Sequence, residues 1–192
     1  MEQSCKIVNT KGQFMATIYF YVKSSKLNET LRYGIKLSQN FSHIVPIKGV
    51  EKKCMVGLLN PKDDIDKFNS DDYVCLKLNL YSEQCYIINE VSLIIPPKDY
   101  EITNIKDYKY GEIESPRVLF SCSILPEEIT ILNKIIDEPL LFDNSKDLFY
   151  QIKITKMMDE LQPSEIYFAL CEYLDYKESK ALSNLENSLK EI

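Results

Sequence analysis

Apolar residues stand at every second position between residues 72 and 80, and this alternation constrains the fold more than any other feature of the sequence. A period of two is typical of a β-strand with one buried face. The residues that would share that face are Val74, Leu76, Leu78 and Leu80. A polar turn over 81–84 and a second apolar run over 85–88 follow, so the spacing predicts a β-hairpin.

Other segments predict further strands and one short helix. Runs rich in aromatic and β-branched residues over 14–22 and 117–124 indicate strands. Pro46 interrupts the apolar residues of 43–50, which restricts that segment to the edge of a sheet. A short helix is expected near 24–33. The front two-thirds of the chain therefore predicts a mixed, mainly antiparallel β core.

The C-terminal part predicts helices. Pro163 opens a segment with apolar residues at helical spacing, and this spacing continues to residue 192. Its predicted apolar face contains Ile166, Leu170, Tyr173 and Leu174. Residues 148–154 alternate as in a strand, with a helix as the alternative. We expect an α+β fold in a single domain over 1–192, with a β-rich core over 1–135 and a mainly helical extension over 136–192.

Charge is distributed unevenly along the chain. Residues 1–60 carry nine Lys or Arg and three Asp or Glu, whereas residues 61–192 carry 14 and 26. An ordinary solvated face is the default interpretation of the basic front, with an anionic ligand as the alternative. Only two arginines, Arg32 and Arg117, are present. This scarcity disfavours nucleic-acid recognition that needs several bidentate Arg contacts.

Several classes of site have no motif in this sequence. The chain has five glycines and neither of the Gly-rich phosphate-binding patterns. His43 is the sole histidine, and no two cysteines are spaced as a metal or redox pair. The acidic run over 63–72 lacks the spacing of a calcium loop, so we expect a solvated loop and no metal. No apolar run approaches the length of a membrane helix and no signal peptide is evident, which predicts a cytoplasmic location and no membrane partner.

Three segments follow one another in close succession over residues 18–35. The strand Ile18-Tyr19-Phe20-Tyr21-Val22 precedes a short helix over 26–31, and Arg32-Tyr33-Gly34-Ile35 follows at once. This order resembles the opening of mono-ADP-ribosyltransferase-like domains, which include DNA-modifying toxins and RNA 2′-phosphotransferases. Residues 73–87 are similar to their central strand, turn and strand. Residues 115–129 resemble the late strand that carries a catalytic Glu, so the resemblance spans about 16–132.

The resemblance implies an NAD site with a catalytic carboxylate. Arg117 stands where the late strand would carry that Glu, so Glu114 takes the role if the strand starts early. Tyr19 or Tyr21 would stack on nicotinamide, and Arg32 would hold the phosphates. The residues expected to bind the cofactor are Tyr19, Tyr21, Arg32, Tyr33 and Gly34. The alternative for each is a scaffold role, with Gly34 as a helix cap and Glu114 in solvent.

Three functions follow as expectations. The first is an NAD-binding ADP-ribosyltransferase-like domain of a bacterial or phage toxin or defence system, acting on a protein or nucleic-acid target. The second is a non-enzymatic interaction protein, such as an immunity protein, antitoxin or phage inhibitor. Its acidic helices and the acidic loop over 63–72 would bind a basic partner. The third is a viral structural component.

Overall fold

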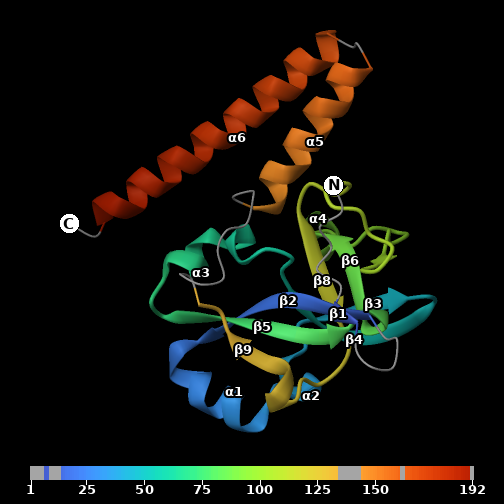
Figure 1. Cartoon of the computed structure of the whole chain (residues 1–192), viewed down its shortest axis with the longest axis vertical. Coiled ribbons are helices and arrows are strands. Elements are labelled where there is room, and N and C mark those ends of the chain that lie inside the picture. Colours follow the sequence, from blue (N-terminus) through green and yellow to red (C-terminus); the bar gives the residue numbers. More distant parts are fainter. Residues whose placement is uncertain (1–6, 9–13, 134–143, 161–162, 191–192) are drawn as a thin grey trace.

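The structure is a computed structural model that describes residues 7–8, 14–133, 144–160 and 163–190. It confirms the α+β class, with antiparallel sheets in the N-terminal part and two C-terminal helices. The sheets form a body, and the C-terminal helices rise from one end of it (Figure 1).

Two antiparallel sheets make up the body. The first has the order β1-β2-β5-β9, with β1 (Ile7–Val8), β2 (Phe14–Lys23), β5 (Tyr73–Tyr81) and β9 (Ile129–Ile131). The second has the order β3-β4-β8-β6-β7, with β3 (His43–Ile47), β4 (Val50–Gly57), β8 (Pro116–Phe120), β6 (Cys85–Asn89) and β7 (Thr103–Asn104). β3 lies at an edge, as Pro46 predicts.

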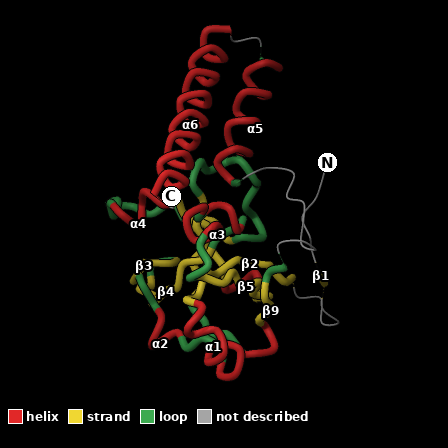
Figure 2. Tube along the Cα trace, turned by 90° about the vertical axis from the view of Figure 1, so that its left-hand side faces the viewer, coloured by secondary structure: helices red, strands yellow, loops and turns green. Residues whose placement is uncertain are grey.

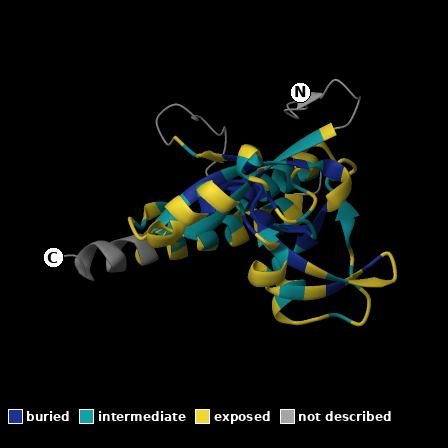
Figure 3. Ribbon diagram, turned by 90° about the horizontal axis from the view of Figure 1, so that it is seen from below, coloured by how far each residue is buried: buried dark blue, intermediate teal, exposed yellow. Residues whose placement is uncertain are grey.

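The main core joins the two sheets. Ile18 of β2, Leu78 of β5, Ile87 of β6 and Phe120 of β8 are fully buried in one cluster. Gly57 lets β4 approach β2 closely, since a Cβ there would meet the side chain of Ile18. Buried residues accordingly gather in the β body (Figure 3).

The predicted hairpin between 72–80 and 85–88 is wrong, although both strands exist. β5 pairs with β2 and β9, whereas β6 pairs with β8 and β7 in the other sheet. The 3₁₀ turn η3 (Ser82–Gln84) carries the chain between the sheets. Residues Cys85 to Ile88 are all buried, with alternate side chains in two different clusters. A strand buried on both faces needs a central position, and the second sheet provides it.

Short helices close the loops of the body. α1 (Leu27–Tyr33) confirms the helix expected near 24–33 and follows the 3₁₀ turn η1 (Ser24–Lys26). α2 (Leu37–Asn40) lies near it, at the end of the body away from the C-terminal helices (Figures 1 and 2). The remaining short helices and 3₁₀ turns are η2 (Pro61–Asp63), α3 (Ile65–Asn69), α4 (Glu90–Ile94) and η4 (Pro126–Glu128).

The C-terminal helices form an antiparallel pair that we call the arm, made of α5 (Ser145–Asp159) and α6 (Pro163–Lys190). Residues 148–154 are therefore helical. Asn144 caps α5, because its side-chain oxygen accepts a hydrogen bond from the backbone N–H of Asp147 at 2.9 Å. Within the described residues, no helix combines the length and the apolar character needed to cross a membrane.

Candidate functional site

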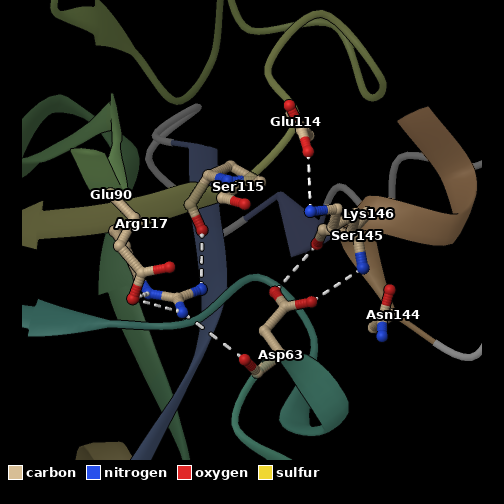
Figure 4. Close-up of a pocket in the computed structure, with 9 residues that line it drawn as sticks. Asp63, Glu90, Glu114, Ser115, Arg117, Asn144, Ser145 and Lys146 are labelled. Carbon is tan, nitrogen blue, oxygen red and sulfur yellow. Dashed lines mark hydrogen bonds and ion pairs between the residues drawn. The ribbon is translucent and has the colours of Figure 1, made fainter. Parts of the chain in front are cut away.

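Glu114 lies in a small pocket at the junction between the arm and the body. The pocket has a volume of about 80 Å³ and is lined by Asp63, Glu90, Glu114, Ser115, Pro116, Arg117, Asn144, Ser145 and Lys146 (Figure 4). Three separate parts of the body and the start of α5 contribute these residues. The pocket thus brings together charged side chains that are far apart in the sequence.

Arg117 supplies the guanidinium of this pocket. Its Nε and Nη2 donate to one carboxylate oxygen of Glu90, at 3.1 and 2.7 Å. Nη2 also donates to the carbonyl oxygen of Asp63 at 3.4 Å. The side chain of Arg117 is only 13% exposed, so these contacts compensate for the water it loses. Arg117 therefore links β8 to α4 and to η2.

Asp63 connects the body to the first residue of α5. Its carboxylate oxygens accept hydrogen bonds from the Ser145 backbone N–H at 2.7 Å and from the Ser145 hydroxyl at 2.8 Å. Burial raises the pKa of Asp63, although these hydrogen bonds and the charge of Arg117 oppose that rise. The expectation of a solvated acidic loop is wrong here, since η2 and α3 occupy this segment and Asp63 is an internal contact.

Glu114 makes the second connection to the arm. Its carboxylate lies 2.7 Å from the ammonium of Lys146 and accepts a hydrogen bond from the Tyr150 hydroxyl at 3.3 Å. We call the contacts Asp63–Ser145 and Glu114–Lys146 the clasp. Each charged side chain that lines the pocket already has a partner among the described residues. The clasp therefore attaches the arm to the body through polar contacts.

Two predicted cofactor residues lie on β2, inside the body. The Tyr21 hydroxyl donates to the carbonyl oxygen of Pro61 at 2.8 Å. The pKa of Tyr21 is raised, mainly because the side chain is buried and secondly because Cys75 lies nearby. Tyr19 exchanges two backbone hydrogen bonds with Leu58, at 2.9 and 2.8 Å. Both tyrosines are half-buried. Tyr21 thus lies near the clasp by its contact with η2, without lining the pocket.

The other three predicted residues lie at the opposite end of the body. Arg32 is exposed and its guanidinium carbon lies 5.2 Å from the ring centroid of Tyr33, which is itself 61% exposed. Gly34 caps α1 with a positive φ of 72°. Neither Arg32 nor Tyr33 lines the pocket that contains Glu114. The structure therefore does not bring these residues together with Glu114.

The pocket is small for a cofactor. Sites for small organic ligands are typically ~300–1,000 Å³, several times the 80 Å³ at Glu114. No three His, Cys, Asp or Glu side chains within the described ranges are placed to hold a metal ion. In this conformation the chemistry of the pocket is that of ion pairs and hydrogen bonds between its own residues.

A buried carboxylate organises the arm. Asp147, in the first turn of α5, is 1% exposed, and it lies 2.6 Å from the ammonium of Lys177 and 4.0 Å from that of Lys180. The Tyr173 hydroxyl donates to it at 3.3 Å. Burial lowers the pKa of Lys177, but the hydrogen bond and charge of Asp147 outweigh burial and leave that pKa raised. Asp147 therefore holds both lysines on the inner side of α6.

The opposite side of α6 presents large apolar side chains to solvent. We call it the outer face and define it by Tyr167, Leu170, Leu174, Glu178 and Leu182, spaced three or four residues apart. Its apolar members are exposed by 66%, 41%, 63% and 56% in that order. Residues of the inner side, including Ala169, Tyr173 and Tyr176, are buried or half-buried. The predicted apolar face thus divides, since Leu170 and Leu174 face outward while Tyr173 packs inward.

Acidic side chains accompany the outer face. Glu178 interrupts the apolar row and Asp175 lies beside it, and both are exposed. Neither forms an ion pair with any residue in the described part of the chain. The outer face therefore combines exposed apolar area with uncompensated negative charge.

The sequence contains a helix-start pattern at the beginning of α5 that the strand interpretation of residues 148–154 left out. Asn144-Ser145-Lys146-Asp147 places a capping residue three positions before an acid, which is a helix-start pattern. This pattern predicts α5 and places Ser145 and Lys146 in its first turn.

Comparisons of the chain with protein-family models, with curated proteins and with solved structures found no match.

Proposed function

We propose that this chain is a non-enzymatic interaction protein, of the kind represented by immunity proteins, antitoxins and phage inhibitors, and that it binds a basic protein through the outer face of α6. One observation carries the proposal. Tyr167, Leu170, Leu174 and Leu182 are exposed along one side of a helix whose other side already packs on α5. Several exposed apolar side chains on one face, with polar neighbours, are typical of a protein-binding surface.

The charge of the arm supports a basic partner. Within residues 163–182 the acids are Glu165, Glu172, Asp175 and Glu178, and the bases are Lys177 and Lys180. Both lysines contact Asp147 on the inner side, so they do not neutralise the outer face. A negative surface attracts positively charged proteins and repels nucleic-acid phosphates. A protein is therefore favoured over nucleic acid as the target.

The pocket at Glu114 supports a structural role for its charged residues. Glu114 pairs with Lys146, and Arg117 pairs with Glu90. The carboxylate of Glu114 contacts the ammonium of Lys146 and the hydroxyl of Tyr150, both on α5, so its contacts position that helix. This arrangement favours a scaffold over an active site.

The test is affinity capture from a lysate of the source cells with three forms of the full chain. Wild type is expected to retain a basic protein, identified by mass spectrometry, whose retention falls as salt rises. Leu174→Ser is expected to reduce that retention at least tenfold, because a central apolar side chain dominates such interfaces.

Met158→Ser provides the matched control. Met158 is 60% exposed, close to the 63% of Leu174, but it lies on α5. The Met158→Ser protein should retain the partner as wild type does. The proposal would be contradicted if Leu174→Ser retained as much partner protein as wild type, or if Leu174→Ser and Met158→Ser reduced retention equally.

The two other expected functions stay predictions with tests of their own. An ADP-ribosyltransferase-like domain should show a thermal shift with millimolar NAD, and that shift should be lost in Glu114→Gln. A viral structural component should elute as a large homo-oligomer in size-exclusion chromatography. Neither result is expected for an interaction protein that acts through α6.

A further inference from the structure

We infer that the partner presents an amphipathic α-helix to the outer face of α6, with Lys or Arg side chains opposite Glu178 and Asp175. The inference rests on the proposed function and specifies which part of the partner protein contacts α6. Shape and charge carry it independently.

The outer face is a single row of side chains that runs obliquely along α6, as rows spaced by four residues do. From Tyr167 to Leu182 the row advances 15 residues, or about 22 Å at 1.5 Å per residue. Side chains spaced by three and four residues fit between those of a second helix with the same spacing. A partner helix of four to five turns would cover the described row.

The charge of the row determines what that helix must carry. Glu178 lies within the apolar row, so a partner that covers Leu174 and Leu182 also removes water from its carboxylate. A carboxylate that loses water needs an opposite charge or a hydrogen-bond donor. Asp175 adds a second negative charge one turn away. Lysine or arginine side chains on the partner helix would satisfy both.

A second copy of this chain does not meet the requirement. The lysines of α6 between residues 163 and 182, the stretch that carries the outer face, are Lys177 and Lys180, and both contact the buried Asp147. Two outer faces would therefore bring Glu178 and Asp175 of each copy together without a nearby cation. Like charges facing each other across an interface oppose association. The helix must come from a different, basic protein.

The experiment measures binding of three synthetic 21-residue peptides to the full chain by fluorescence anisotropy at low salt. The first peptide carries Leu at helical spacing with flanking Lys. The second replaces each Lys with Glu, and the third places Pro at the centre of the first to break its helix. Wild type is expected to bind the Leu/Lys peptide at least tenfold more tightly than either of the others.

Two charge reversals locate the contact. Glu178→Lys is expected to weaken binding of the Leu/Lys peptide at least tenfold and to improve binding of the Leu/Glu peptide. Glu165→Lys makes the same charge change on the same helix, at an exposed position off the row, and should alter binding less than threefold.

The outcomes separate this inference from the proposed function. Absent binding of the Leu/Lys peptide, equal binding of the Pro peptide, or equal effects of the two reversals would overturn the helical, basic partner. The proposed function would still stand if capture of a protein depended on Leu174. Loss of that dependence would remove the proposed function itself.

Discussion

At the scale of single residues, Gly34 can be interpreted either as a cofactor-binding residue or as the cap of α1. It ends α1 at a φ of 72°, and the next residue, Ile35, forms an isolated bridge with Ile124. A Cβ at Gly34 would collide with the carbonyl oxygen of Ile124. These contacts explain a glycine here by backbone geometry, the cap role that the sequence offered as the alternative to cofactor binding.

Substituting Gly34 tests that explanation. Gly34→Ala should lower the free energy of unfolding by more than about 2 kcal/mol, because left-handed strain of about 1–2 kcal/mol adds to a backbone clash. Gly49→Ala is the matched control, since Gly49 has a φ of 76° and nothing within 4 Å of the added Cβ. It should cost only about 1 kcal/mol. Urea denaturation followed by circular dichroism gives both values, and equal costs would contradict the clash.

The acidic residues show where sequence reasoning ends at this scale. Glu114 was singled out only as the catalytic carboxylate that the resemblance implies, and nothing in the sequence indicated its ion pair with Lys146. Asp63 was not, since its buried environment depends on Ser145, 82 residues later. A run of aspartates is ordinarily solvated, and only the tertiary fold brings the start of α5 against this one.

At the scale of elements, periodicity predicted strands better than it predicted their partners. The alternation of β5 was correct, and so was the edge position of β3. The pairing of β5 with β6 was wrong because short sequence separation favours a hairpin only when both strands belong to one sheet. β6 is buried on both faces, and a central place in the second sheet satisfies that burial.

The arm illustrates a different limit. Helical spacing identifies which side chains share a face, but it does not say which face packs inward. In α6 the aromatic and lysine side chains that meet Asp147 are inside, and leucines are outside. Asp147 directly precedes residues 148–154, whose alternation also matched a strand, and no pattern in the sequence indicated that this acid would be buried.

The Asp147–Lys177 and Lys153–Glu172 ion pairs, which both join α5 to α6, should differ in their contribution to stability. Asp147→Asn should lower the free energy of unfolding of the arm by about 1–3 kcal/mol, because a buried charge-assisted hydrogen bond to Lys177 is lost. Glu172→Gln removes the Lys153–Glu172 pair, whose Glu172 side chain is 55% exposed, and should cost about 0–1 kcal/mol. Thermal unfolding followed by tyrosine fluorescence compares them. A larger effect for Glu172 would show that Asp147 does not organise the arm.

At the scale of the whole molecule, the chain divides by the kind of contact that holds each part. The two hydrophobic clusters contain residues of the body, and none from the described portions of α5 or α6. The arm joins the body through the polar clasp at Asp63 and Glu114 and through the Ile152 side chain of α5, which packs on Gly111. Regions with few buried apolar contacts open more easily than a packed core.

Hydrogen exchange should reveal this division. Backbone amides of α6 are expected to exchange at least tenfold faster than those of β5 and β8 at neutral pH, since the arm can open without exposing the main core. Mass spectrometry of peptic fragments measures both regions in one experiment. Slow exchange of α6, at the rate of the core strands, would mean that the arm and the body unfold as one unit.

The unequal lengths of the two arm helices have a consequence for how such a protein can change. α6 has 28 residues and α5 has 15, and the Asp147–Lys180 contact marks where α6 runs past the start of α5 (Figure 1). Whole turns could be added to or removed from that overhang without disturbing either sheet. The row from Tyr167 to Leu182 lies almost wholly before the overhang, so the overhang can gain or lose length and charge while that row and both sheets keep their structure.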